Sequence, residues 1–471
     1  MTKPSAASKT LPWHNIRMLT ELFDTGTLSA VEIVDAAYAR IAEKDAELQA
    51  FAVLWPERAR AAAKRLDAAK SKGEALGTLR GIPIALKDLV DVAGEPTRAG
   101  TTALGESVAA QNAEVTDRLE AAGAVLLGKV KMTEGAFVEH HESVTPPVNP
   151  WNPERWTGIS SSGSGVAVAG GLCTAALGTD TGGSIRYPSA ACGLTGLKPT
   201  HGRVSLRGVF PLAASLDHIG PMGRSVDDVD RLFRVLAGFD PADPWSLAAN
   251  PPVPALPDVP DSIAGLRIGV DADYLSDHLA PEVAAAIQTA LDVFEKAGAH
   301  LVPVRLPDLN RALAAWVFLG SAEIARAHAE TFPAKADQYG AALRGAIEQG
   351  MATDPRAVAE GYEARVEFSR RFAALFDEVD AFAAPVIPGP LVANTNLADP
   401  EKFPEAGAAV RYTTPFNLSG SPSLTFPIGF DSGAAPIGFQ LVGPHLAEPV
   451  LLRLGAAYQT ATDWHTRHPE I

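Results

Sequence analysis

The segment 157–200 constrains the fold most, because it combines hydroxyl side chains with glycines and aliphatic residues. It opens with three consecutive serines, Ser160, Ser161 and Ser162, and Ser184 follows Ser160 by 24 positions, directly after two glycines. A flexible linker can be rich in serine and glycine, but it would not carry the valines and leucines found at 166–177. We therefore expect buried, tightly turned backbone that presents hydroxyl groups, which makes the segment a candidate nucleophile site.

Short apolar runs alternate with helical patterns along the 471 residues, of which 46% are hydrophobic and 20% charged. The runs at 82–86, 124–127, 266–270 and 301–304 predict strands, while 115–122 and 281–297 predict helices that each stop before a glycine. Alternation of this kind favours an α/β fold with helices packed on a central sheet.

The chain is expected to form a single domain, 1–471, in four parts. Residues 1–70 predict a helical part, in which Ser29 and Glu32 form a capping box and 57–72 a solvated helix. The part 75–240 carries the motifs described below, and the proline-rich stretch 241–263 predicts a surface loop. The remainder, 264–471, predicts strands at 423–426 and 437–441 and a closing helix at 447–461.

Composition narrows the partners and the compartment. The net charge of −15 argues against a nucleic-acid partner, and no run of about 18 apolar residues predicts a membrane span. The two cysteines, Cys173 and Cys192, predict small buried side chains, and no metal-ligand spacing or signal peptide is evident. We expect a cytoplasmic monomer or homodimer that acts on a small molecule without a metal.

The turn Gly182-Gly183-Ser184 can direct several backbone N–H groups at one point, as an oxyanion hole requires, although such turns are common. A serine nucleophile also needs a base. No Gly-x-Ser-x-Gly elbow accompanies the eleven histidines. Lys87 ends an apolar run, and burial would lower the pKa of its amine. The alternative is a lysine that reaches water beside Asp88.

Taken together, these motifs resemble the amidase signature family, most closely its bacterial aryl acylamidase and urethanase types. The resemblance spans about residues 15–465 and rests on motifs that agree in order: 81–88, 158–164, 178–186, 193–200, 202–205, 215–222, 415–417 and 436–441. It implies the amidase-signature fold, in which a large mixed β-sheet is flanked by helices on both faces.

The resemblance also implies a site that needs no cofactor. Ser184 would be the nucleophile, Ser160 a bridging serine that follows a cis peptide bond, and Lys87 the base. The backbone N–H groups of Thr181, Gly182, Gly183 and Ser184 would hold the oxyanion. Ser161 would donate a supporting hydrogen bond, and Asp180 would pair with Arg186 to fix the turn.

The sequence departs from the family pattern at two sites. Ile159 and Ser162 stand where glycines are usual in the serine loop. The loop 134–141 also differs from that of the glutaminyl-tRNA amidotransferase subunits. In the family this region lines the acyl side of the pocket, so Ala136 and Phe137 become candidate substrate contacts.

Three histidines lie near these motifs. His140 and His141 could touch substrate, but a structural or surface role is the expectation for both. The neighbours Asp217 and His218 resemble a catalytic pair, yet they fall within a structural motif of the family, and we expect them to be structural.

The expected function is hydrolysis of an amide or carbamate C–N bond through an acyl-enzyme on Ser184. A small to medium, fairly apolar substrate such as an aryl acylamide or a urethane fits best. One alternative is an amidotransferase A-type subunit that releases ammonia for a partner. Another is a non-catalytic binding protein, against which the intact Lys87, Ser160 and Ser184 argue.

Overall fold

The structure, a computed structural model, describes residues 11–105, 107–257, 261–393, 395 and 404–471. Within these residues a single mixed sheet of eleven strands has the order β1-β3-β2-β4-β6-β5-β10-β11-β9-β7-β8. Its strands are β1 (Phe51–Leu54), β2 (Pro83–Lys87), β3 (Val125–Val130), β4 (Ala175–Asp180), β5 (Thr195–Lys198), β6 (His218–Gly223), β7 (Arg267–Val270), β8 (His300–Pro303), β9 (Ala381–Pro385), β10 (Ser423–Phe430) and β11 (Pro436–Val442).

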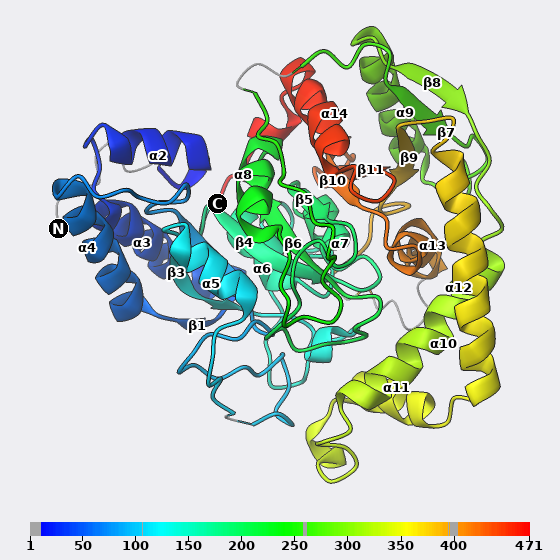
Figure 1. The fold of residues 1–471 in the computed structure, drawn as a ribbon, viewed down its shortest axis with the longest axis horizontal. Coiled ribbons are helices and arrows are strands. Elements are labelled where there is room, and N and C mark those ends of the chain that lie inside the picture. The colour runs from blue at the N-terminus through cyan, green and yellow to red at the C-terminus, as the bar shows by residue number, and fades with distance from the viewer. Residues whose placement is uncertain (1–10, 106, 258–260, 394, 396–403) are drawn as a thin grey trace.

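Helices surround this sheet (Figure 1). They are α2 (Ile16–Asp24), α3 (Ala30–Leu48), α4 (Pro56–Ser71), α5 (Glu114–Ala121), α6 (Ser162–Ala169), α7 (Arg186–Ala191), α8 (Val226–Leu236), α9 (Pro281–Lys296), α10 (Asn310–Ala327), α11 (Ala341–Met351), α12 (Pro355–Leu375), α13 (Pro404–Leu418) and α14 (Glu448–Ala461), with a 3₁₀ turn η2 at Glu134–Ala136.

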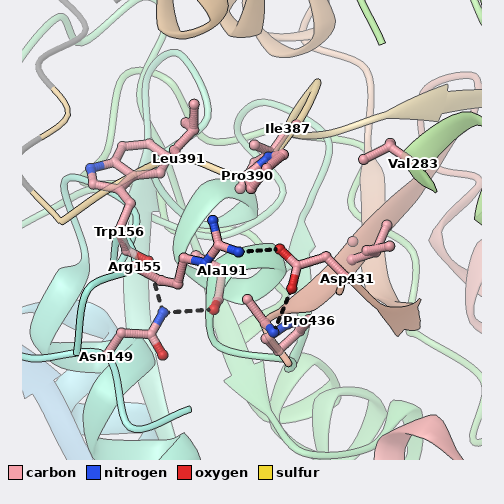
Figure 2. A pocket seen from close by; sticks show the side chains of 14 residues that line it. Asn149, Arg155, Trp156, Ala191, Val283, Ile387, Pro390, Leu391, Asp431 and Pro436 are labelled. Carbon is pink, nitrogen blue, oxygen red and sulfur yellow. Dashed lines mark hydrogen bonds and ion pairs between the residues drawn. The ribbon is translucent and has the colours of Figure 1, made fainter. Parts of the chain in front are cut away.

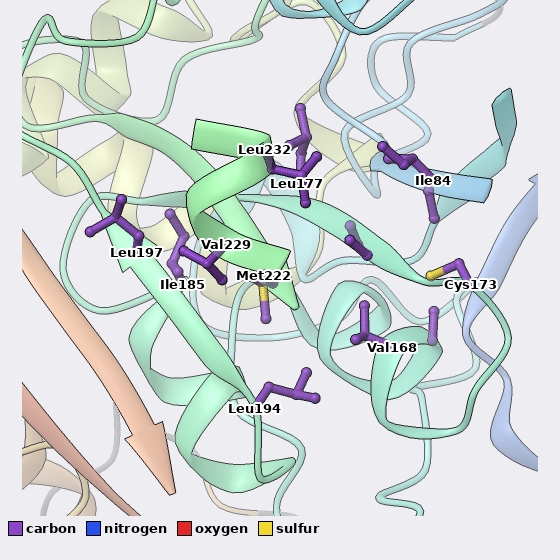
Figure 3. Close-up of a cluster of buried hydrophobic side chains, with 14 of the residues drawn as sticks. Ile84, Val168, Cys173, Leu177, Ile185, Leu194, Leu197, Met222, Val229 and Leu232 are labelled. Atoms are coloured by element: carbon purple, nitrogen blue, oxygen red, sulfur yellow. The ribbon is translucent and has the colours of Figure 1, made fainter. Parts of the chain in front are cut away.

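The strands in the middle of the sheet are buried on both faces. Figure 3 shows Val168 from α6 and Leu232 from α8 meeting the strand that carries Leu177 from its two sides. Every residue of β2, β4 and β6 is buried, so these strands do not alternate between buried and exposed positions. The predicted α/β fold, with a mixed sheet flanked by helices, is confirmed.

Most predicted elements appear within a few residues of their expected bounds. Ser29 and Glu32 form the capping box at the start of α3, as expected. The part predicted to be helical at 1–70 contains α2, α3 and nearly all of α4, and it also contains the unpredicted strand β1, which pairs antiparallel with β3 at the sheet edge. Among the described residues, no helix has the length and apolarity needed to cross a bilayer.

The helices α11 and α12 each pack against α10 at one side of the molecule (Figure 1). α10 also packs against α13, which lies close to the sheet. We call α10, α11, α12 and α13 the helical group. Side chains from this group reach the serine-rich segment from outside the sheet.

Candidate active site

Strand pairing explains how residues 87 and 180 come together. β2 pairs in parallel with β4, with Ile84 opposite Ala175. Lys87 is the last residue of β2 and Asp180 the last of β4. Because parallel strands end at the same edge of a sheet, both residues lie at that edge, where α/β proteins commonly place their sites.

Lys87 is fully buried and donates hydrogen bonds to two hydroxyls. Its Nζ lies 2.7 Å from Ser160 Oγ and 2.8 Å from Thr179 Oγ1. Burial lowers the pKa of Lys87 to about 7, and the carboxylates of Asp217 and Asp180 oppose this change. The alternative of a lysine that reaches water is therefore wrong, and a large fraction of the amine is neutral near pH 7.

The serine loop joins Lys87 to β4. The peptide bond between Ile159 and Ser160 is cis, as the resemblance implies. Ser161 Oγ lies 3.2 Å from the Thr179 N–H and 3.3 Å from the Thr179 carbonyl, so it accepts from the first and donates to the second. Ser160 and Ser161 are both fully buried.

Ser184 is partly exposed at the turn between β4 and α7. Three carbonyls of this turn accept hydrogen bonds: Thr181 from Trp316 Nε1 at 2.8 Å, Gly182 from Thr413 Oγ1 at 2.6 Å, and Gly183 from the N–H of Tyr187 at 2.7 Å. In a trans peptide the N–H points opposite to the carbonyl. These bonds therefore turn the N–H groups of the next residues to the other side.

One of those N–H groups already has a partner. Gly183 N–H donates to Asp180 Oδ1 at 2.8 Å. An oxyanion bound at this turn would have to share that donor with Asp180, while the N–H groups of Gly182 and Ser184 are aimed by the carbonyl bonds described above.

The two glycines of the turn are required by close approach of aromatic rings. A Cβ on Gly182 would lie 2.5 Å from the Trp316 ring, and one on Gly183 would lie 2.4 Å from the Tyr187 ring. Gly183 also has φ of +133°, which other residues rarely adopt. The turn is therefore held between two aromatic side chains.

Asp180 and Arg186 form the expected ion pair, with Oδ1 2.9 Å from Nη2, and both side chains are fully buried. Burial alone would raise the pKa of Asp180, but Arg186 and then Lys198 and Asn417 hold it well below its usual range. Asn417 Nδ2 donates to Asp180 Oδ1 at 2.8 Å. Asp180 thus stays ionised and accepts from the turn.

Asp217 supports the same turn from another direction. Its carboxylate accepts from the hydroxyl of Thr181 and from the N–H groups of Leu212 and Ala213. Burial raises the pKa of Asp217 to about 6. His218 instead places Nδ1 against the carbonyls of Leu216 and Asp180. Asp217 and His218 thus bind different groups and are not hydrogen-bonded to each other among these contacts.

The helical group is fastened beside Asp217. Glu323 of α10 accepts from the N–H and Oγ of Ser215 at 2.9 and 2.5 Å. Arg365 of α12 donates to the Ser215 carbonyl at 2.8 Å. α10 is therefore held both at Ser215 and, through Trp316, at Thr181.

The loop after β3 lies next to the serine loop. Thr133 N–H donates to the carbonyl of Ser160 at 3.2 Å. Ala136 is buried with φ of +61°, and Phe137 is half-buried. Both candidate substrate contacts thus follow closely, in the same loop, after the residue that is hydrogen-bonded to Ser160.

His140 and His141 bind hydroxyls close to them in sequence or in space. His140 Nε2 lies 3.0 Å from Ser162 Oγ, and His141 Nδ1 lies 2.7 Å from Ser143 Oγ. The hydroxyl of Ser162, which stands where glycine is usual, is thereby tied to the 134–141 loop.

Sequence reasoning missed three residues of this site. Thr179 binds Lys87 directly, and its position beside Asp180 on a strand end was the available signal. Thr413 had no sequence signal, because it reaches Gly182 across 231 residues. Trp316 likewise reaches the turn from far along the chain, through its hydrogen bond to Thr181 across 135 residues.

A separate pocket lies beside α7 and is lined by Ala191 and by residues near Pro390 and Pro436 (Figure 2). Arg155 and Asp431 pair there at 3.0 Å, and Asn149 donates to the carbonyls of Trp156 and Ala191. These polar groups satisfy one another. Across the described ranges, no three His, Cys, Asp or Glu side chains are grouped as metal ligands.

The fold and the site together define an α/β protein in which a buried lysine at the carboxyl end of a strand is hydrogen-bonded to a buried serine of a neighbouring loop. The Amidase family model matches residues 32–452. The chain belongs to the amidase signature family, whose members act on amides.

Three known proteins place the chain within that family. It is 40% identical over 470 residues to AmiD of Mycobacterium tuberculosis, whose name assigns it provisionally to the amidases, with 96% of each chain covered. It is 39% identical to the A-type subunit of glutamyl-tRNA(Gln) amidotransferase from Chloroflexus aggregans, with 95% and 96% covered. The solved peptide amidase of Stenotrophomonas maltophilia has a TM-score of 0.81 and 30% identity, with 98% and 99% covered.

Proposed function

We propose that this protein hydrolyses C–N bonds through an acyl-enzyme on Ser184, with Ser160 and neutral Lys87 as the proton relay. The observation that carries the proposal is the 2.7 Å contact between Lys87 Nζ and Ser160 Oγ in a fully buried setting. Burial lowers the pKa of Lys87 to about 7, so the amine can accept a proton at neutral pH.

The reaction follows from this arrangement. Lys87 takes the proton of Ser160, which takes that of Ser184, and Ser184 Oγ attacks the substrate carbonyl carbon. Backbone N–H groups of the turn stabilise the oxyanion. The C–N bond then breaks as Ser160 returns a proton to the leaving amine. Water attacks the ester by the reverse relay and releases the acid and Ser184.

We propose a small to medium, fairly apolar substrate, such as an aryl acylamide or a urethane. Aromatic side chains near Ser184 support this proposal. The rings of Trp316 and Tyr187 flank the turn that carries it, and half-buried Phe137 follows in the loop beside Ser160. A carbamate would pass through a carbonate- or carbamoyl-enzyme instead of an ordinary ester.

A second candidate is an amidotransferase A-type subunit that releases ammonia for a partner. The observation in its favour is the 39% identity to the C. aggregans protein over nearly the whole chain. Release of ammonia from glutamine, together with a partner chain that co-purifies, would favour this candidate over a free-standing hydrolase.

Amine release should be measured across primary amides, anilides, alkyl amides and aryl carbamates. Ser184→Ala should lower kcat by roughly 10⁴-fold or more, as loss of a nucleophile does in serine hydrolases. Ser189→Ala is the matched control, because that buried hydroxyl of α7 has no hydrogen-bond partner among the described residues. It should keep full activity.

A fluorophosphonate probe distinguishes an enzyme from a binding protein. Wild type and Ser189→Ala should be labelled at Ser184, whereas Ser184→Ala should stay unlabelled. Retained turnover by Ser184→Ala would contradict the assignment of the nucleophile. Absence of both labelling and turnover in the wild type would favour the binding protein.

A further inference from the structure

Gly320, in the middle of α10, has an unusual environment for a buried helical glycine. The residue is buried, yet a Cβ built on it would meet no neighbouring atom within 4 Å. Open space therefore adjoins the helix at this point.

Helix packing explains two neighbouring glycines but not Gly320. A Cβ on Gly350 of α11 would lie 2.0 Å from the carbonyl oxygen of Ser321 in α10, so close packing of the two helices requires glycine there. A Cβ on Gly361 of α12 would lie 3.3 Å from the side chain of Leu319. Gly320 has no such wall, and glycine inside a helix is unfavourable compared with alanine.

Gly320 shares a helix face with two residues that bind segments near Ser184. Residues at i, i+4 and i+7 share one face of a helix, so Gly320 lies on the face that carries Trp316 and Glu323. Trp316 Nε1 donates to the Thr181 carbonyl at 2.8 Å, and its ring lies against Gly182. Glu323 accepts from Ser215 at 2.9 Å. Both neighbours of Gly320 on that face are thus fixed to segments that support Ser184.

The other end of α10 reaches the loop beside Ser160. His328, which caps the helix, lies 3.2 Å from the position of a Cβ on Gly135. α10 therefore runs from the oxyanion turn to the 134–137 loop, and Gly320 sits between these two contacts.

We propose that Gly320 is a specificity-determining residue, whose missing side chain leaves room for a bulky group of the amide or carbamate substrate beside Trp316. The inference rests on the proposed hydrolase function and adds the position that sets substrate size. A Cβ at 320 would enter that room without meeting another part of the protein within 4 Å.

The test uses Gly320→Ala and Gly320→Leu in the full-length enzyme. Gly345→Ala and Gly345→Leu are matched controls, because Gly345 is an exposed residue of α11 and a Cβ there also meets nothing within 4 Å. Two substrate series are compared: 4-nitroanilides with acyl groups from acetyl to hexanoyl, and acetamides with amine groups from methyl to benzyl.

We expect Gly320→Leu to lower kcat/KM for the bulkiest member of one series roughly tenfold or more relative to its smallest member, since a methylene in an apolar pocket has effects of that size. Gly320→Ala should show a smaller shift in the same series and keep the melting temperature. Both Gly345 variants should keep the wild-type ratios.

Suppose that the wild type is active and that both Gly320 variants keep its kcat/KM ratio between the bulkiest and the smallest member in both series. This result would overturn the inference about Gly320 and leave the hydrolase assignment standing. An inactive wild type that also fails to react with the fluorophosphonate would overturn both. If Gly320→Leu fails to fold, the ratios of Gly320→Ala decide, because alanine adds one carbon into open space.

Discussion

The indole N–H of Trp316 donates a hydrogen bond to the carbonyl of Thr181 at 2.8 Å, across 135 residues of sequence. The same ring lies against Gly182, so a Cβ there would come within 2.5 Å of it. One side chain of α10 thereby fixes both the carbonyl direction and the position of the turn that precedes Ser184. Trp316 therefore joins α10 to the turn at 181–184.

Trp316→Phe should keep the ring against Gly182 but remove the partner of the Thr181 carbonyl. A hydrogen bond of this kind contributes about 1 kcal/mol, so kcat should fall roughly fivefold to tenfold while KM changes less. Steady-state kinetics on one good substrate measure this. Trp245→Phe, at a 41% exposed tryptophan, is the control and should leave kcat unchanged. An unchanged kcat for Trp316→Phe would show that the bond does not orient the turn.

The rate should depend on the protonation of Lys87. Burial lowers its pKa to about 7, and the neutral amine is the form that accepts a proton. The ratio kcat/KM should therefore rise with pH through about 7 and level off above about pH 8. The unfolded chain keeps this lysine protonated up to about pH 10. The contribution of Lys87 to the free energy of unfolding therefore increases with pH between about 7 and about 10. A profile without an acid limb would contradict the role of Lys87.

Thr179→Val should move that acid limb to lower pH. Thr179 Oγ1 accepts from Lys87 Nζ at 2.8 Å, which favours the protonated amine. Loss of the hydroxyl should lower the pKa of Lys87 and also reduce kcat, since the amine loses an orienting partner. Thr179→Ser keeps the hydroxyl and should retain the wild-type limb. A limb shifted to higher pH in Thr179→Val would be inconsistent with this account.

Asp217→Asn should shift the limb in the same direction for an electrostatic reason. The Asp217 carboxylate opposes the lowering of the Lys87 pKa, so neutralising it should lower that pKa further. The amide oxygen can still accept from Thr181. Asp228→Asn, at another fully buried carboxyl, is the control for removal of a buried charge, and its kcat/KM profile should match the wild type.

Arg186→Met should be strongly destabilising. Asp180 and Arg186 are both fully buried and paired at 2.9 Å, and removing one partner of such a pair typically costs about 3–5 kcal/mol of unfolding free energy. Urea denaturation measures the loss. Arg467→Met breaks an exposed pair with Asp463 and should change stability by less than about 1 kcal/mol. Similar losses in the two variants would mean that the buried pair contributes no more to the free energy of unfolding than the exposed pair.

The sequence allowed the fold class and the strands β2, β3, β7, β8, β10 and β11 to be predicted, because short apolar runs mark them. The central strands β4, β5 and β6 were not predicted, because glycine and polar residues interrupt their apolar residues. Nor did the sequence allow β1 to be predicted. Its four residues, Phe51–Leu54, stand between two long helices and are too few to show a period. Pairing with β3, more than 70 residues later, makes this segment a strand.

The local part of the site could likewise be anticipated from motifs, and the remote part could not. Lys87, Ser160 and Asp180 lie in recognisable segments, and the structure brings them to one sheet edge. Thr413 and Glu323 reach the site from helices whose sequences carry no mark of it. Their contacts depend on how α10 and α13 pack, which is a property of the assembled chain.

The sheet order has a consequence for synthesis on the ribosome. β5 pairs with β10, so that Gly196 lies opposite Thr425, and Asn417 reaches back to Asp180. A nascent chain that ends before these residues lacks the neighbour of β5 and a partner of the buried carboxylate. Contacts of such long sequence separation form slowly. The turn after β4 therefore gains its full set of partners only once the chain has been synthesised past Asn417 and β10.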